Sequence, residues 1–202
     1  IKNSGGIGIP TVKPWNAETV KDKMKMVRDS GAFAAAMDVD AAGLPFLKGL
    51  TPPAGRKSVR ELSEIIQDAG VPFIVKGIMT VRGAKKALEA GASAIVVSNH
   101  GGRVLDGCSP TAYVLSDIAE AVGDKMKIFV DGGIRSGVDV FKALALGADA
   151  VLIARPFVTA VYGAGAEGVS AYIRKVGGEL EDTMQMCGAD KLSDIEEDMI
   201  EF

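Results

Sequence analysis

Short apolar runs alternate with amphipathic segments along almost the whole chain. The runs lie at 6–12, 33–39, 72–76, 93–98, 127–132 and 149–154 and are rich in Val, Ile and Ala, as buried strands are. Segments with apolar residues at helical spacing lie between them, at 16–31, 58–70, 80–91, 109–123 and 136–147, and a further helical region follows the last run. This alternation predicts six strand-helix units and an α/β fold with a parallel sheet.

The first helical segment and the longest connection carry additional local signals. Asn16 suits the N-cap position, and Val20, Met24 and Val27 form one apolar stripe. The connection at 41–58 is rich in Gly and Pro. It is interpreted either as a lid or binding segment or as a plain surface excursion, and the sequence leaves both open.

Two segments form an internal repeat. FIVKGIMTVRGAKKALEAGASAIVVS (73–98) superposes on IFVDGGIRSGVDVFKALALGADAVLIA (128–154), with one extra glycine in the second loop. The two helices end at Gly91 and Gly147, which suit a left-handed C-cap. Such repeats are typical of a TIM (β/α)8 barrel or of a doubly wound sheet. Because a barrel has eight units, we expect one barrel domain over residues 1–202 that lacks its first two units.

Composition narrows the classes of function. The chain has 202 residues, 48% of them hydrophobic, and a net charge of -3 without a basic cluster, so we expect one well-filled core and no nucleic-acid partner. No apolar run is long enough to span a membrane and the first residues do not resemble a signal peptide, which favours a cytoplasmic protein. Cys108 and Cys187 lack CxxC spacing and histidine partners, so we expect reduced thiols and no metal site.

Polar residues close most of the predicted strands. They are Asp38 and Asp40, Lys76, Ser98–Arg103, Asp131–Arg135 and Arg155. In both candidate architectures, function gathers at the carboxyl ends of strands. His100 is the sole histidine and lies in a glycine-rich loop, with Arg103 following it. A lone loop histidine is more often structural, but a base beside an anion-binding arginine favours acid-base chemistry on an anionic ligand.

The nonapeptide SNHGGRVLD, Ser98–Asp106, strongly resembles the active-site signature of the FMN-dependent 2-hydroxy-acid oxidases and dehydrogenases. The motif is long and specific, and the resemblance extends over nearly the whole chain. It implies a TIM barrel that binds FMN and oxidises a small L-2-hydroxy acid, similar to lactate or glycolate, to the 2-oxo acid. It implies that His100 takes a proton while a hydride equivalent passes to flavin N5, that Asp40 orients His100, and that Arg103 binds the substrate carboxylate.

The resemblance also implies cofactor contacts at neighbouring strand ends. Lys76 would lie near flavin N1 and O2, where a cation stabilises reduced flavin, and Ser98 would contact the flavin or its ribityl chain. The residues assigned to the ribityl and phosphate regions are Asp131, Gly132, Gly133, Arg135, Ala154 and Arg155. A solvated lysine and a plain tight turn are the simpler alternatives. The family also implies a homo-oligomer, and the electron acceptor, oxygen or a carrier, stays open.

Several positions depart from the family pattern. Pro10 and Val12 stand where such oxidases carry a glutamine for flavin and a tyrosine for substrate, Asp38 replaces a threonine, and Ala154 replaces a glycine. The segment AAGLPFLKG also lacks the family's second arginine. A carboxylate at Asp38 would oppose reduced, anionic flavin unless it is protonated or paired with Lys76. Two other functions therefore remain open: another FMN-barrel enzyme such as isopentenyl-diphosphate isomerase, which the His-Gly-Gly-Arg loop disfavours, and a non-catalytic FMN-binding module.

Overall fold

The fold is a six-stranded parallel sheet whose strands follow one another in chain order, β1 to β6. It is seen in a computed structural model that describes residues 1–47 and 49–201. The strands are β1 (Thr11–Val12), β2 (Ala35–Asp38), β3 (Phe73–Ile78), β4 (Ala94–Val97), β5 (Lys127–Asp131) and β6 (Ala150–Leu152). Each strand pairs in parallel with the next, so the predicted α/β class and unit order are confirmed. The sheet corresponds to six consecutive units of a TIM barrel.

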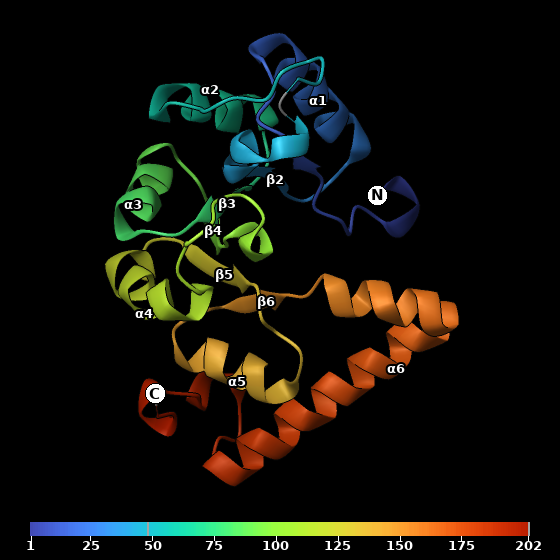
Figure 1. Ribbon diagram of the computed structural model, residues 1–202, viewed down its shortest axis with the longest axis vertical. Helices are drawn as coiled ribbons and strands as arrows, with labels where there is room; N and C mark the ends of the chain where they lie inside the picture. The colour runs from blue at the N-terminus through green and yellow to red at the C-terminus, as the bar shows by residue number, and fades with distance from the viewer. Residues whose placement is uncertain (48, 202) are drawn as a thin grey trace.

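Helices follow the strands, and those between β2 and β5 cover one side of the sheet (Figure 1). They are α1 (Ala17–Ser30), α2 (Val59–Ala69), α3 (Val81–Glu89), α4 (Thr111–Val122), α5 (Gly137–Ala145) and α6 (Arg155–Cys187). Figure 1 shows α2, α3 and α4 on the left of the strands, whereas α6 extends to the right and then returns toward α5. In α6 the helical geometry breaks at Ala164 and Gly165, which gives the helix its sharp bend.

The local helix signals are confirmed. The Asn16 side chain accepts a hydrogen bond from the Thr19 backbone, and Val20, Met24 and Val27 are buried. Gly91 and Gly147 have φ values of 94° and 92°, so both adopt the left-handed conformation that glycine permits without a Cβ penalty. These turns return the chain to the amino end of the next strand and thus set the direction in which that strand runs.

The predicted first strand was too long. Only Thr11 and Val12 pair with β2, whereas 6–12 was expected to be extended. Gly6 has a φ of 84° and belongs to a turn, and Pro10 has no backbone N–H to contribute to a ladder. β1 is therefore a very short strand at one edge of the sheet.

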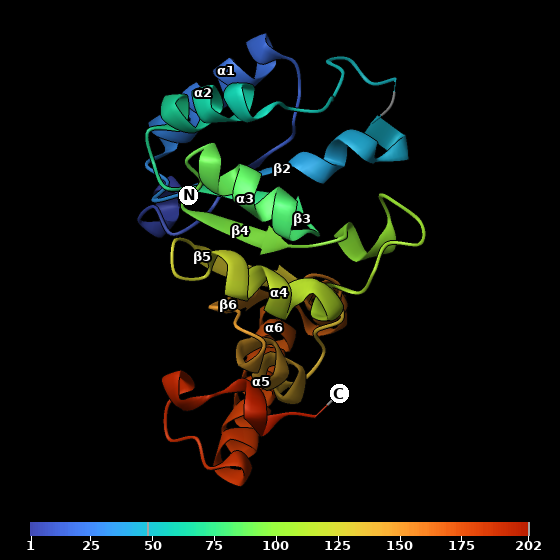
Figure 2. The same ribbon diagram turned by 90° about the vertical axis from the view of Figure 1, so that its left-hand side faces the viewer.

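The connection at 41–58 is more than a surface excursion. Two 3-10 helices, η2 (Val39–Gly43) and η3 (Pro45–Leu47), begin it. Ala41, Leu44 and Leu47 form a small buried cluster against which Ala54 and Val104 pack. Since Val104 directly follows the predicted His100–Arg103 loop, this packing joins the two loops. Lys48, which belongs to the same connection, lies outside the described residues. Figure 2 shows the segments after β2 and β4 projecting on the same side.

Candidate active site

Parallel strands bring the predicted polar residues to one edge of the sheet. Asp38 and Asp131 end β2 and β5, and Lys76 lies near the end of β3, paired in register with Asp38. Ser98 directly follows β4, and His100 begins η4 (His100–Gly102). The chain direction alone therefore gathers these side chains from four neighbouring strands.

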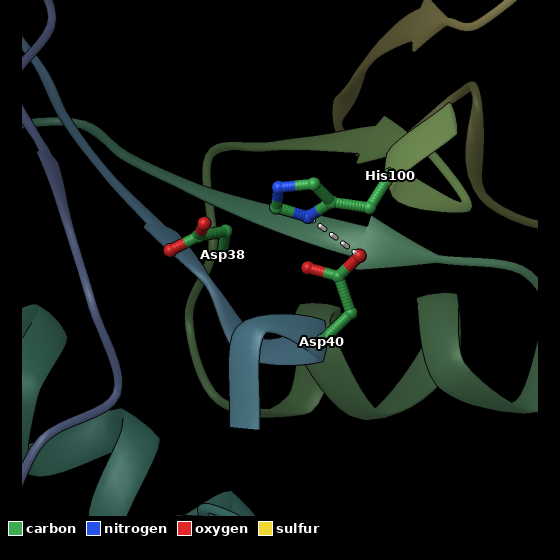
Figure 3. A group of neighbouring side chains, drawn as sticks. All are labelled: Asp38, Asp40 and His100. Carbon is green, nitrogen blue, oxygen red and sulfur yellow. Dashed lines mark hydrogen bonds and ion pairs between the residues drawn. The ribbon is translucent and has the colours of Figure 1, made fainter. Parts of the chain in front are cut away.

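His100 is held in an uncommon backbone conformation by two hydrogen bonds. Its φ of 58° is the one positive φ of a non-glycine residue among residues 1–47 and 49–201, and such a conformation costs about 1–2 kcal/mol. Its backbone N–H donates to Ser98 Oγ at 3.1 Å. Its ring Nδ1 lies 3.1 Å from Asp40 Oδ2, as Figure 3 shows. Nδ1 is thus engaged by Asp40, and His100 also lines the cleft described below.

Asp40 reaches His100 because Gly77 gives it room. A Cβ atom on Gly77 would lie 2.5 Å from the Asp40 carboxyl carbon, and Gly77 itself has a φ of 95°. Burial raises the pKa of the Asp40 carboxyl, while the neighbouring His100 opposes that rise. Gly77 escaped the sequence analysis, although a glycine inside a strand pattern is a known signal for close approach of another group.

Lys76 joins two of the predicted cofactor residues. Its Nζ donates to Ser98 Oγ at 2.6 Å and forms an ion pair with Asp131. Asp131 keeps its second carboxylate oxygen, Oδ1, buried without a hydrogen-bond partner. Ser98 has an exposed fraction of 0%, and its hydroxyl oxygen accepts hydrogen bonds from both Lys76 Nζ and the His100 backbone N–H.

Asp38 pairs with a residue that the sequence analysis did not single out. Lys13 forms an ion pair with Asp38, whereas Lys76, the partner considered from the sequence, binds Ser98 and Asp131. The cause is register: Val12 pairs with Met37, so Lys13 follows β1 at the level where Asp38 ends β2. Of the two ways considered for offsetting the Asp38 charge, pairing with Lys76 does not occur, and Lys13 is the partner instead.

A cleft of about 350 Å³ lies above this edge of the sheet. Its lining residues are Lys76, His100, Gly101, Arg103, Asp131, Gly132, Gly133, Ile134, Arg135, Leu152, Ile153, Ala154 and Arg155. The volume lies within the usual range for small-molecule sites. Most of the predicted site thus faces one cavity, to which Ile134, Leu152 and Ile153 add an apolar wall that the sequence analysis missed.

The glycine-rich end of the cleft differs in part from expectation. Gly132 and Gly133 have φ values of 90° and 85°. Arg155 lies against the His100 loop, since a Cβ on Gly101 would approach its guanidinium to 3.0 Å. The start of α5 was expected to offer backbone N–H groups to a phosphate.

Carboxylates already occupy three of those N–H groups. The backbone N–H groups of Arg135 and Ser136 donate to Asp139, and that of Gly137 donates to Glu179 from α6. The Arg135 side chain donates to the Ile134 carbonyl oxygen at 2.7 Å. The helix terminus therefore has fewer N–H groups to offer an anion than expected, and Arg135 and Arg155 are the cations that line this end of the cleft.

Asp38, Asp40 and His100 also form a possible metal-ligand group. Each offers a ligand atom, and these atoms lie within 4.8 Å of one another; no other such group occurs among residues 1–47 and 49–201. Asp40 and His100 bind each other, however, and Asp38 binds Lys13. Protein partners thus already engage all three side chains.

The sequence from residue 10 to residue 202 matches the family model described as FMN-dependent dehydrogenase. The chain belongs to this FMN-dependent dehydrogenase family. Among its relatives, L-lactate oxidase from Roseobacter sp. (strain GAI101) is 44% identical over 140 residues, which cover 69% of this chain and 38% of the relative. The 4-hydroxymandelate oxidase of Amycolatopsis orientalis is 47% identical over 122 residues, covering 60% of this chain and 34% of the relative.

Solved structures of family members share the fold. A mandelate oxidase with (S)-4-hydroxymandelic acid superposes with a TM-score of 0.87 at 29% identity, covering 97% of this chain and 66% of that chain. A mandelate oxidase with benzoyl-formic acid gives a TM-score of 0.87 at 32% identity, covering 97% and 63%. The chain thus spans about three fifths of these structures, and the matched segment covers about a third of the curated relatives. Within the part that the structure describes, no helix is long and apolar enough to cross a bilayer.

FMN is the cofactor of this family, and the cleft of this family member fits it. Arg135 and Arg155 supply cations for a phosphate. Asp131 Oδ1 is a buried acceptor without a partner, suited to a hydroxyl group of a ribityl chain. Lys76 supplies a cation on the cleft wall, and Ile134 and Leu152 supply apolar surface for a ring.

Proposed function

We propose that the protein is an FMN-dependent oxidoreductase that converts a small L-2-hydroxy acid, similar to lactate or glycolate, into the 2-oxo acid. The observation that carries the proposal is the placement of His100. It is held by Asp40 and lines the same cleft as Arg103. An imidazole, a guanidinium and a cavity within the usual size range of small-molecule sites therefore converge at one strand edge, which supports the proposal.

The side chains of this cleft suit the three tasks of the reaction. Arg103 binds the substrate carboxylate, since a guanidinium can hold both oxygens at once. The 2-hydroxyl group is then directed to His100. FMN, when bound, accepts the two electrons and the hydrogen that leave the substrate carbon. His100 takes the hydroxyl proton on Nε2, so the products are the 2-oxo acid, reduced cofactor and an imidazolium ion.

Asp40 and Lys76 support this step electrostatically. Asp40 accepts the hydrogen of Nδ1, which leaves Nε2 as the acceptor, and its charge stabilises the imidazolium as it forms. Lys76, positioned by Ser98 and Asp131, would supply positive charge to the ring of bound FMN, to which reduction would add negative charge. Gly132, Gly133, Arg135, Ala154 and Arg155 bind the remainder of FMN.

Substrate identity, acceptor and assembly belong to the same proposal. Related proteins are named for lactate and 4-hydroxymandelate, and we infer that this protein acts on the smaller kind of acid, similar to lactate. Oxygen or a carrier reoxidises the flavin, the protein works as a homo-oligomer, and its compartment is the cytoplasm. A relative from Arabidopsis thaliana is named peroxisomal (S)-2-hydroxyacid oxidase, so the compartment is to be tested by localising the protein in cells.

An anaerobic absorbance titration tests the activity. The FMN-loaded protein is mixed with each enantiomer of lactate and mandelate and with glycolate, and the oxidised flavin band is followed. The proposal expects bleaching by L-lactate or glycolate and formation of the matching 2-oxo acid in equal amount. A protein that binds FMN but is not reduced by any of these acids is a binding module or a different flavin enzyme, and the proposed activity is then wrong.

A further inference from the structure

Lys13 and Asp38 form a charge pair beside the proposed catalytic base. Asp38 has an exposed fraction of 2% and the Lys13 side chain one of 29%, so the carboxylate is buried and the ammonium reaches it from the rim. The second oxygen of Asp38 has no hydrogen-bond partner. A buried carboxylate without a cation would be unfavourable, and Lys13 is the cation that the structure gives it.

Asp38 is close enough to act on the His100–Asp40 pair. Ligand atoms of the three residues lie within 4.8 Å of one another, and Figure 3 shows Asp38 beside the pair without a hydrogen bond or ion pair to either member. After burial, the charge of Asp38 is one of the causes that raise the pKa of Asp40. At such separations one charge changes a neighbouring pKa by about 1–3 pH units. The charge state of Asp38 therefore matters to His100.

The other charged groups of the cleft and of the His100–Asp40 pair come from several elements. They are Asp38 of β2, Asp40 of η2, Lys76 of β3, Asp131 of β5, Arg103 of the His100 loop, Arg135 of the loop after β5 and Arg155 of α6. Lys76 and Asp131 pair with each other, and Asp40 binds the imidazole itself. Asp38 pairs with Lys13, from the segment after β1.

We propose that Lys13 is a positioning residue that acts on His100 through Asp38. By offsetting the charge of Asp38, Lys13 lets the imidazole of His100 remain unprotonated before each turnover. This role rests on the proposed function, because it assumes that His100 is the base. Without Lys13, the negative charge of Asp38 would stabilise the imidazolium. His100 would then hold a proton at a pH where it must accept one.

The sign of each variant follows from this charge arrangement. Lys13→Gln leaves Asp38 uncompensated, so the pKa of His100 rises by about one pH unit or more. Asp38→Asn leaves Lys13 uncompensated, so the pKa of His100 falls. The double variant removes both charges and returns the pKa close to that of the parent, because the two effects are coupled through one pair.

Histidine NMR tests this without turnover. His100 is the sole histidine of the 202-residue sequence, so its imidazole signal in the histidine-labelled, FMN-loaded protein is assigned by its loss in His100→Gln. Opposite changes in pKa in the two single variants and recovery in the double variant support the proposal. An unchanged pKa in Lys13→Gln, or changes of the same sign in both single variants, would overturn it.

The pH profile of flavin reduction supplies the second readout. In Lys13→Gln we expect the acidic limb of the profile to move to higher pH, by the same amount as the pKa of His100 measured by NMR. At a fixed pH on that limb, the rate of flavin reduction then falls about tenfold for each pH unit of movement. A limb that stays in place contradicts the role of Lys13. Should Lys13→Gln fail to fold, Asp38→Asn and the double variant still give the predicted decrease in the pKa of His100 and its reversal.

The two hypotheses have separate tests. A flavin that no hydroxy acid reduces defeats the proposed activity, whereas the NMR titration still decides whether Lys13 controls the pKa of His100.

Discussion

A side chain on Gly77 would occupy the space of Asp40: a Cβ atom there would lie 2.5 Å from the Asp40 carboxyl carbon. Gly77 is thus the residue that lets Asp40 reach His100. Its φ of 95° adds a second reason for glycine at this position.

The variant Gly77→Ala is expected to displace Asp40 and slow flavin reduction by about 10- to 100-fold, because His100 loses its orienting partner. It should also lower the melting temperature. Gly31→Ala is the matched control, since Gly31 has a φ of 70° but open space around its Cβ position. The control should lose a comparable amount of stability from backbone strain without the loss in rate. Equal rates in the two variants would refute the role of Gly77.

The variant Asp40→Asn tests the linkage between pH and stability. Burial raises the pKa of Asp40 in the folded protein above its ordinary value of 3.8, with His100 opposing the rise. The folded state therefore binds a proton more tightly than the unfolded state, and this carboxyl lowers stability as pH rises from about 4 through the folded pKa. Denaturant unfolding at a series of pH values should show this loss in the parent and a smaller one in Asp40→Asn. A larger loss in the variant would reverse the assigned direction.

The variant Lys76→Met removes one of the cations that line the cleft, the one proposed to lie near the flavin ring, and leaves the carboxylate of Asp131 without its ion pair. Reduced flavin then lacks its compensating charge, so the flavin midpoint potential should become more negative and flavin reduction slower by about tenfold or more. Spectroelectrochemical titration measures the potential. Lys127→Met is the control, because it breaks another Lys–Asp pair, a more exposed one with Asp149, at the opposite end of the sheet. A similar potential in both variants would exclude Lys76 as the compensating cation.

The variant Arg103→Lys keeps the charge but loses the planar guanidinium that can hold both oxygens of a carboxylate. We expect KM for the hydroxy acid to rise about 10-fold or more, with FMN content unchanged. Arg60→Lys provides the comparison, since Arg60 forms an exposed pair with Glu64 on α2. Steady-state kinetics with the acid that best bleaches the flavin measures the difference, and an unchanged KM in Arg103→Lys would place the carboxylate elsewhere.

Much of the site could be predicted because parallel strands end at one edge. Lys76, Ser98 and Asp131 each close a strand that periodicity alone identifies, and the structure joins all three through Lys76. The roles of His100, Asp40 and Arg103 came instead from the likeness of SNHGGR to a known family. The residue pattern predicted where these side chains lie, and the resemblance to the family predicted what they do.

The rest depended on contacts between distant segments. The pairing of Lys13 with Asp38 follows from the register of β1 on β2, which hydrophobic periodicity does not determine. The occupation of the Gly137 backbone N–H by Glu179 requires α6 to return along α5. Neither relationship leaves a local signal in the sequence.

His100 is the proposed base, and single-turnover reduction of the flavin in His100→Gln is the decisive test of that role. FMN-loaded parent and variant are mixed anaerobically with the hydroxy acid that reduces the parent, and bleaching of the flavin band is timed. We expect the variant to keep its FMN and to bleach about 10²- to 10⁴-fold more slowly. Bleaching at the parent's rate in a variant with full FMN content would contradict it.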